Sequence, residues 1–401
     1  MAEHAHSHAH AHEAAPEGER PAPKPVREEK MPPQDDAVEV APGVIRLQLT
    51  IALPGLGHVN CYAIEDDRGV ALVDPGLPGR KPWNELVRRL GAAGLPIERV
   101  HTVIITHSHP DHFGAAGHIR KVTGAEIVTH AQFKTFFDPN EEDDEDKELA
   151  DPRDLDTWAA ARERLIRAAE RSAGEVRSRT KQQVRQWRRW NGPTPWGGPH
   201  PRPPRKARYS YAAQQLTGLG WFRPPRPSSR VVDGEVLVLG GREWVAVHTP
   251  GHTVDHLCLL EPASGTFISG DHVLPTITPH ISGLVQADDP LDLYFNSLER
   301  LYELDGVRTV LPAHGLAFGD LHQRCRDIQH HHRDRLELLR VAGADLGEAP
   351  VSDYSQRLFK PMAWGPMADS ETYAHLEHLV RAGEAERREV PGEGLRYRLT
   401  G

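Results

Sequence analysis

The sequence predicts an α+β protein built on a sandwich of β-sheets, and two observations lead to this fold class. Short apolar runs typical of strands recur at residues 103–105, 244–247, 266–268 and 307–311. Each run is followed within a few residues by histidine or aspartate. Polar side chains that repeatedly follow strands indicate loops that meet at one end of a sheet sandwich.

The first of these loops, T-H-S-H-P-D-H at residues 106–112, is the densest group of polar residues. It holds four potential metal ligands: His107, His109, Asp111 and His112. Imidazole and carboxylate suit zinc, and also iron or manganese, and the lack of a nearby cysteine argues against a closed structural zinc site. Four ligands within six residues exceed what one tetrahedral ion with an open position takes from one loop. Two ions are therefore the simpler prediction.

Chance clustering is the alternative, since histidine makes up 25 of the 401 residues. Three further motifs argue against chance, because each places a ligand-type residue after a predicted strand. They are Thr249-Pro250-Gly251-His252, Ser269-Gly270-Asp271 and Leu311-Pro312-Ala313-His314-Gly315.

Together these motifs resemble those of the metallo-β-lactamase-fold hydrolases, over about residues 41–340. The resemblance implies a four-layer αββα sandwich with a two-metal site at one edge. The implied ligands are His107, His109 and His252 for one metal, Asp111, His112 and His314 for the other, and Asp271 bridging both. The motif Leu72-Val73-Asp74-Pro75-Gly76 resembles another family motif, whose aspartate, here Asp74, would lie behind the ligands and orient them.

Two departures from relatives within this family narrow the expected activity. True β-lactamases resemble this pattern but lack an aspartate at the bridging position, so Asp271 argues against antibiotic hydrolysis. Flavodiiron proteins carry a glutamate where this chain has His109, which argues against an oxygen-reducing di-iron site.

Composition limits the class of protein. The net charge of −9 does not favour a nucleic-acid-binding protein, and no apolar run approaches the roughly 20 residues that span a bilayer. The three cysteines are far apart and odd in number, so we expect no disulfide framework and a cytoplasmic location.

The elements are expected in the following order. Strands cover residues 44–53, 59–65 and 70–74. His58 and Asn60 lie just before or at the second of these strands, beside a glycine-rich loop that is expected to be a plain turn. Helices at 81–94 and 112–124 follow, then strands at 231–239, 244–247, 256–261 and 266–268, a helix at 292–304 and a long helix from Asp320. His272 and His280 match no ligand position.

We expect three domains. Residues 1–36, rich in histidine and proline, predict a disordered tail, and residues 37–340 the catalytic domain. An insertion at 138–230 predicts a helical lid, whose basic residues could bind an anionic group. These are Arg185, Arg188, Arg189, Arg202, Arg205, Lys206 and Arg208.

Residues 341–401 are expected to form the third domain, with helices at 352–359 and 370–382 and strands at 385–390 and 395–399. This order resembles a winged-helix module, as in the β-lactamase-like protein 2 group. Its acidic residues favour packing or oligomerisation, with a homodimer as one form, over DNA reading.

The expected function is a dinuclear metal-dependent hydrolase with two Zn²⁺ per chain. A metal-bridging hydroxide would attack a thioester, ester or lactone, as in the hydroxyacylglutathione hydrolases that the motifs resemble, and Asp111 would orient it and take up its proton. The substrate would be a small and possibly anionic molecule. The alternatives are a phosphodiesterase or ribonuclease, a mononuclear iron sulfur dioxygenase, and a non-catalytic zinc-binding protein.

Overall fold

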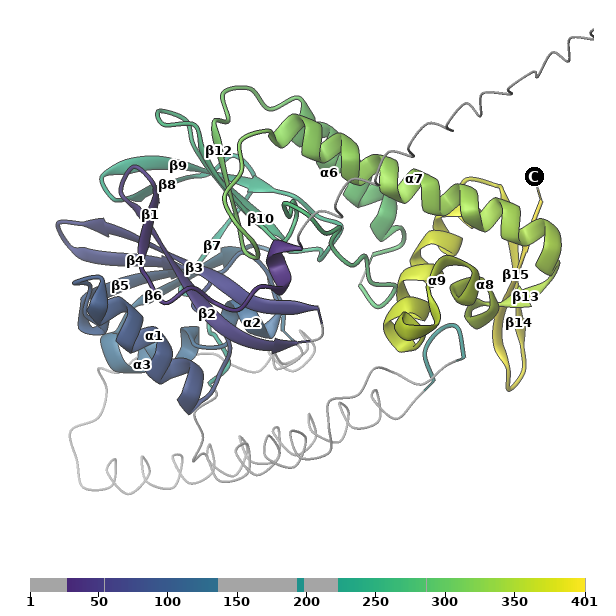
Figure 1. The fold of residues 1–401 in the computed structure, drawn as a ribbon, viewed down its shortest axis with the longest axis horizontal. Helices are drawn as coiled ribbons and strands as arrows, with labels where there is room; N and C mark the ends of the chain where they lie inside the picture. The colour runs from purple at the N-terminus through teal and green to yellow at the C-terminus, as the bar shows by residue number, and fades with distance from the viewer. Residues whose placement is uncertain (1–26, 54, 136–192, 198–222, 286, 401) are drawn as a thin grey trace, which may run out of the picture.

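Two facing β-sheets form the centre of this computed structural model, which describes residues 27–53, 55–135, 193–197, 223–285 and 287–400 (Figure 1). The first sheet runs in sequence order: β1 (Val38–Ala41), β2 (Val44–Leu53), β3 (Leu56–Asp66), β4 (Gly69–Val73), β5 (Val100–Ile104), β6 (Glu126–His130) and β7 (Ser229–Val231). The second has the order β12 (Thr309–Pro312), β11 (Thr266–Gly270), β10 (Leu257–Glu261), β9 (Arg242–His248) and β8 (Val236–Leu239).

Helices cover the outer face of each sheet. The first sheet is covered by α1 (Arg80–Ala92), the short η2 (Ile97–Arg99) and α3 (Ala116–Thr123), and the second by α6 (Pro290–Tyr302) and α7 (Leu321–Leu346). The four-layer α+β sandwich predicted from the sequence is therefore confirmed.

The alternation of strand side chains explains these layers. In β4, Val70 and Leu72 pack in the cluster beneath α1 and α3, whereas Ala71 and Val73 pack between the two sheets. Successive side chains of a strand point to opposite faces, so a strand that is apolar at every position can bury both faces. Trp244 of β9, fully buried, fills the space between the sheets.

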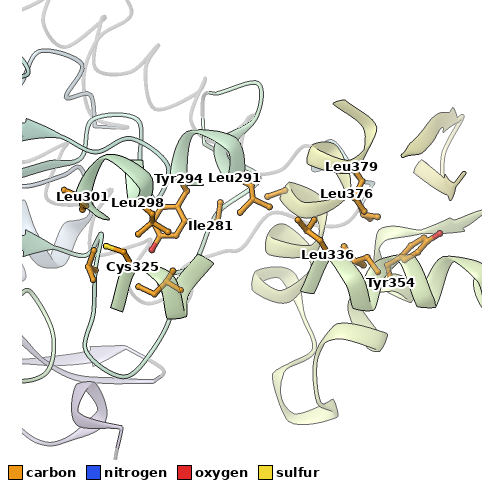
Figure 2. Close-up of a cluster of buried hydrophobic side chains, with 14 of the residues drawn as sticks. Ile281, Leu291, Tyr294, Leu298, Leu301, Cys325, Leu336, Tyr354, Leu376 and Leu379 are labelled. Atoms are coloured by element: carbon orange, nitrogen blue, oxygen red, sulfur yellow. The ribbon is translucent and has the colours of Figure 1, made fainter. Parts of the chain in front are cut away.

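The C-terminal part packs on α6 and α7. It consists of β13 (Ala349–Pro350), α8 (Val351–Leu358), η4 (Pro361–Ala363), α9 (Pro366–Arg381), β14 (Ala385–Val390) and β15 (Gly394–Leu399). One apolar cluster runs from the outer face of the second sheet into this unit, and Figure 2 shows Tyr294 and Leu298 of α6 on one side and Leu336, Leu376 and Leu379 on the other. We call residues 349–399 the C-terminal unit.

Two predicted elements of the sandwich are each divided in the structure. The helix expected at 112–124 is two helices, α2 (Pro110–Phe113) and α3, because the chain turns at Gly114 to lie against the loop after β4. A Cβ on Gly114 would lie 2.2 Å from Pro78 Cδ, and Ala115 N donates to Gly76 O at 3.1 Å. The strand expected at 231–239 is β7 and β8, which belong to different sheets and are separated by a turn at Gly234, where φ is 79°.

His58 and Asn60, expected just before or at the second strand, both lie within β3 and are buried. Asn60 Nδ2 donates to Pro312 O at 2.7 Å and to Gly315 O at 2.9 Å, so it holds the loop after β12. No local pattern in the sequence reveals these long-range partners.

The folded part of the chain begins before residue 37. Residues Glu28–Lys30 form η1, and the fully buried Glu29 accepts hydrogen bonds from Thr276 N at 2.8 Å and Ile277 N at 3.0 Å. The disordered tail expected at 1–36 therefore extends too far at its C-terminal end. At the other boundary, residue 340 falls inside α7, which continues to Leu346.

Several predictions lie outside the described residues: most of the tail, most of the insertion and all seven of its basic lid residues. One described piece of the insertion, residues 193–197, places Trp196 against Tyr373 of α9, with ring centroids 4.8 Å apart. Among the described residues, no helix combines the length and the apolar character that a membrane crossing requires.

Candidate metal centre

Seven polar side chains meet where strands of both sheets end. His107, His109, Asp111 and His112 follow β5, His252 lies between β9 and β10, Asp271 follows β11 and His314 follows β12. They form two groups, one of His107, His109, His252 and Asp271 and one of Asp111, His112 and His314. The structure thus brings together every residue that the sequence nominated as a ligand.

The histidines of the first group face one another through ring nitrogens. His109 Nδ1 lies 3.0 Å from His107 Nε2 and 3.1 Å from His252 Nε2. One ring nitrogen carries at most one hydrogen, so His109 cannot satisfy both neighbours by donation. A cation bound among the three nitrogens would satisfy all of them, because each nitrogen could direct its lone pair at the cation.

Asp271 connects the two groups. Its Oδ2 lies 3.6 Å from His252 Nε2 and 3.5 Å from His112 Nε2, and its Oδ1 lies 3.2 Å from His314 Nε2. Asp111 Oδ2 faces the second group, 3.6 Å from His112 Nε2 and 3.7 Å from His314 Nε2. One carboxylate therefore stands between two sets of nitrogen and oxygen ligands.

Hydrogen bonds behind the cluster assign the tautomers. The Nδ1 atoms of His112, His314 and His252 donate to Asp74 Oδ2 at 2.8 Å, His58 O at 2.7 Å and His280 O at 2.8 Å. Because Nδ1 carries the hydrogen in each neutral ring, Nε2 presents a lone pair towards the centre.

The inward atoms lack other partners. Among the described residues, Nε2 of His112, Nε2 of His314 and Oδ1 of Asp271 are buried without a hydrogen bond. Buried polar atoms are rarely left in this state, so several lone pairs directed at one another fit bound cations better than a purely structural cluster.

Asp74 orients this arrangement from behind. It is 1% exposed, and besides His112 it accepts from Thr106 N at 2.9 Å and Thr106 Oγ1 at 2.7 Å. Thr106 Oγ1, having donated to Asp74, accepts from His107 Nδ1 at 3.0 Å. Asp74 is also the one described non-glycine residue with positive φ, 55°, and such strained backbone is often found at functional sites.

Electrostatics differ between the two groups. Burial lowers the pKa of His107 well below its ordinary value and the pKa of His109 to about 3, so these imidazoles are in the neutral form that binds cations. Burial would also lower the pKa of His112 and His314, but the charges of Asp271 and Asp111, joined by that of Asp74 at His112, together outweigh it and both pKa values are raised. A cation at the second group must therefore displace protons, and its binding weakens as the pH falls.

Two residues at the site were missed. His256 is fully buried, donates from Nδ1 to Thr249 Oγ1 at 2.8 Å and accepts at Nε2 from Asp271 N at 3.1 Å, and so positions the backbone that carries Asp271. Its sequence position had indicated only the start of a strand. His280 contributes its carbonyl oxygen to His252, and no local pattern reveals a backbone acceptor.

Comparison with known proteins agrees with the fold described above. The model of the metallo-beta-lactamase superfamily matches residues 54–314. A metallo-beta-lactamase family protein of Thermus thermophilus is 26% identical with a TM-score of 0.64, and the match covers 90% of this chain and 100% of that one. A beta-lactamase domain protein of Burkholderia ambifaria is 26% identical with a TM-score of 0.62, covering 92% of this chain and 96% of that one.

Curated relatives match over shorter segments. Lactamase-like protein aptB of Emericella nidulans is 32% identical over 137 residues, which are 32% of this chain and 42% of that protein. An atrochrysone carboxyl ACP thioesterase of Aspergillus fumigatus is 30% identical over 134 residues, 33% of this chain and 40% of that protein. These matches span less than half of the relatives' own length.

Proposed function

Since the chain belongs to the metallo-beta-lactamase superfamily, we propose that it is a dinuclear metal-dependent hydrolase that cleaves a thioester, with esters and lactones as related substrates. The observation that carries the proposal is the position of Asp271 between two complete groups of inward-facing ligands. The thioesterase named among the relatives supports the choice of a thioester over other bonds.

The residues would divide the work as follows. His107, His109 and His252 would hold one cation, Asp111, His112 and His314 the second, and Asp271 both. A two-cation centre supplies hydroxide at neutral pH and polarises the scissile carbonyl. Asp111 has one oxygen towards His112 and His314, which leaves its other oxygen to orient the attacking water and accept its proton.

Zinc is the proposed metal, because three imidazoles with a carboxylate form a donor set that zinc accepts readily. Iron or manganese at the same ligands is the alternative. The complete second group favours two cations over the single iron of a sulfur dioxygenase.

The C-terminal unit gives no support for nucleic-acid binding, because arginines of its β14–β15 hairpin are paired with carboxylates. Arg388 pairs with Glu348, Arg398 with Glu386 and Arg396 with Glu393. These ion pairs support a packing role for the C-terminal unit. The substrate that we propose is a small molecule that binds at the metal centre. The three cysteines, all buried and free, support a reducing, cytoplasmic location.

Metal analysis combined with a substrate panel tests the proposal. We expect close to two zinc ions per chain and turnover of acyl thioesters, including an acyl chain on a carrier-protein phosphopantetheine, with weaker turnover of lactones. One iron per chain with oxygen uptake on a persulfide, or cleavage of bis-phosphodiesters alone, would overturn it.

A further inference from the structure

A row of hydrogen bonds leads from the metal centre into the C-terminal unit. His252 Nδ1 donates to the backbone oxygen of His280 at 2.8 Å. The ring of His280, through Nδ1, donates to Glu371 Oε2 of α9 at 3.1 Å. Arg335 of α7 pairs with the other oxygen, Glu371 Oε1. A helix far along the chain thus holds the residue that orients a candidate ligand.

The backbone beside His280 is held by the same helix. Gly283 N lies 3.1 Å from Ser370 Oγ and 3.2 Å from Ser370 O, both acceptors, and the hydroxyls of Ser282 and Ser370 are 3.2 Å apart. A Cβ on Gly283 would lie 2.3 Å from Tyr373 Cδ1. The loop therefore rests directly on the first turns of α9, and its position depends on that helix.

Glu371 is well suited to this role. It is 8% exposed, and although burial alone would raise the pKa of its carboxyl, the hydrogen bond from His280 and the charge of Arg335 lower it below the ordinary value. A buried carboxylate with both oxygens engaged is held rigidly, because moving it would leave a charge unpaired.

A separate metal site at this point would be a competing explanation, since His332, Glu371 and His375 lie close together. Their hydrogen bonds argue against it. Both Glu371 oxygens already have cationic or donor partners, His375 Nδ1 donates to Glu371 O at 2.7 Å, and His332 Nδ1 donates to His375 Nε2 at 3.0 Å. These contacts describe a network that joins α7 to α9.

We propose that Glu371 and Ser370 are positioning residues for the metal centre. By fixing the loop at His280, they fix the acceptor for His252 Nδ1 and hence the direction of its Nε2 lone pair. The C-terminal unit is then part of the metal centre's support as well as a packing module. This role rests on the cation site of the proposed function and is independent of the substrate.

The variant Glu371→Gln tests this role, because an amide has one oxygen for two donors and loses the charge that Arg335 requires. Its matched control is Glu384→Gln, which breaks the ion pair of Arg340 in α7 with the segment after α9, at 2.6 Å, without touching the loop. The measurements are Zn²⁺ affinity by competition with a chromophoric chelator, the visible spectrum of the Co²⁺-loaded protein and the thermal unfolding midpoint of each metal-free protein.

We expect Glu371→Gln to weaken the affinity of one of the two cations about 10-fold, the lower end of the range for partners behind ligands, and to alter the Co²⁺ spectrum. Glu384→Gln should leave both unchanged, and its partly exposed ion pair should cost less in the unfolding midpoint than the buried pair of Glu371. Ser370→Ala, which removes only the hydroxyl contacts to the loop, should change affinity and spectrum in the same direction. If Glu371→Gln does not fold, this variant alone tests the positioning role.

The two possible failures are distinct. A wild-type protein that binds no cation overturns the proposed function. A wild-type protein that binds two cations, with the same affinities and the same Co²⁺ spectrum in Glu371→Gln or, failing that, in Ser370→Ala, overturns the positioning role alone.

Discussion

Asp74 accepts a hydrogen bond from His112 Nδ1 at 2.8 Å, and the two residues come from different strand ends of the first sheet. The same carboxylate binds the backbone and hydroxyl of Thr106, which in turn accepts from His107. One buried aspartate thus orients a histidine of each ligand group.

Replacing Asp74 with asparagine should weaken cation binding at both groups. An amide keeps the shape but presents an N–H₂ where His112 or Thr106 needs an acceptor, so we expect a loss of about 10- to 100-fold in metal affinity. Chelator competition measures it. Asp66→Asn, which removes a carboxylate–histidine pair with His101 at 3.2 Å outside the centre, is the control and should bind metal normally. Equal affinities for the two variants would contradict the orienting role.

Asp271→Asn should reduce thioester turnover on the order of 10³-fold, about 4 kcal/mol of transition-state stabilisation, because the carboxylate shared by both groups is lost. Steady-state kinetics with metal analysis separates lost chemistry from lost metal. Asp233→Asn removes an exposed ion pair with Arg300 at 2.9 Å and should keep wild-type kinetics. Full turnover in Asp271→Asn with two cations retained would exclude the bridging role.

Gly270→Ala should disturb both stability and the metal centre. A Cβ there would lie 2.7 Å from His256 Nε2, which accepts from the backbone N–H of Asp271, and φ is 52°. We expect a cost of about 2–4 kcal/mol in unfolding free energy, from strain and from overpacking, together with weaker metal binding. Urea unfolding and chelator competition measure the two effects.

Gly306→Ala is the control for Gly270→Ala, since φ is 81° and nothing lies within 4 Å of its Cβ. It should cost only the roughly 1–2 kcal/mol of the left-handed backbone and leave metal affinity unchanged. If both variants lost metal affinity to the same degree, contact with His256 would not be the cause.

Stability of the metal-free protein should fall with acid, partly through His375. Burial lowers the pKa of this residue to about 4, so the folded state holds it neutral while the unfolded chain protonates it near 6.5. Its contribution is complete above pH 6.5 and is lost as the pH falls towards 4. Between pH 7 and pH 5 this single group accounts for about 2 kcal/mol of unfolding free energy.

The comparison of His375→Gln with wild type at pH 7 and pH 5 isolates this contribution. The variant should show a smaller pH dependence by about that amount, whereas His330→Gln, at a residue whose side chain is 77% exposed, should behave as wild type. An unchanged pH dependence in His375→Gln would show that this histidine is protonated equally in both states.

The candidate ligands could be identified from the sequence because they follow strands directly. The apolar runs show where each strand ends. The motif at 106–112 places four candidate ligands within one short loop, so their closeness can be predicted without knowing any distant contact. The break between α2 and α3 could not be predicted from the sequence, because it depends on a distant contact. It depends on Pro78, a residue 36 positions before Gly114 that approaches only in the folded chain.

The candidate ligands could be chosen from the sequence motifs alone. The sequence also determined the layers of the sandwich, since the period of two along each strand sets which side chains are buried and on which face. Tertiary structure decided which nitrogen of each imidazole faces the centre. That choice depends on the acceptor behind the ring, and for His314 and His252 the acceptors are backbone oxygens of His58 and His280, which only the folded chain brings within hydrogen-bond distance.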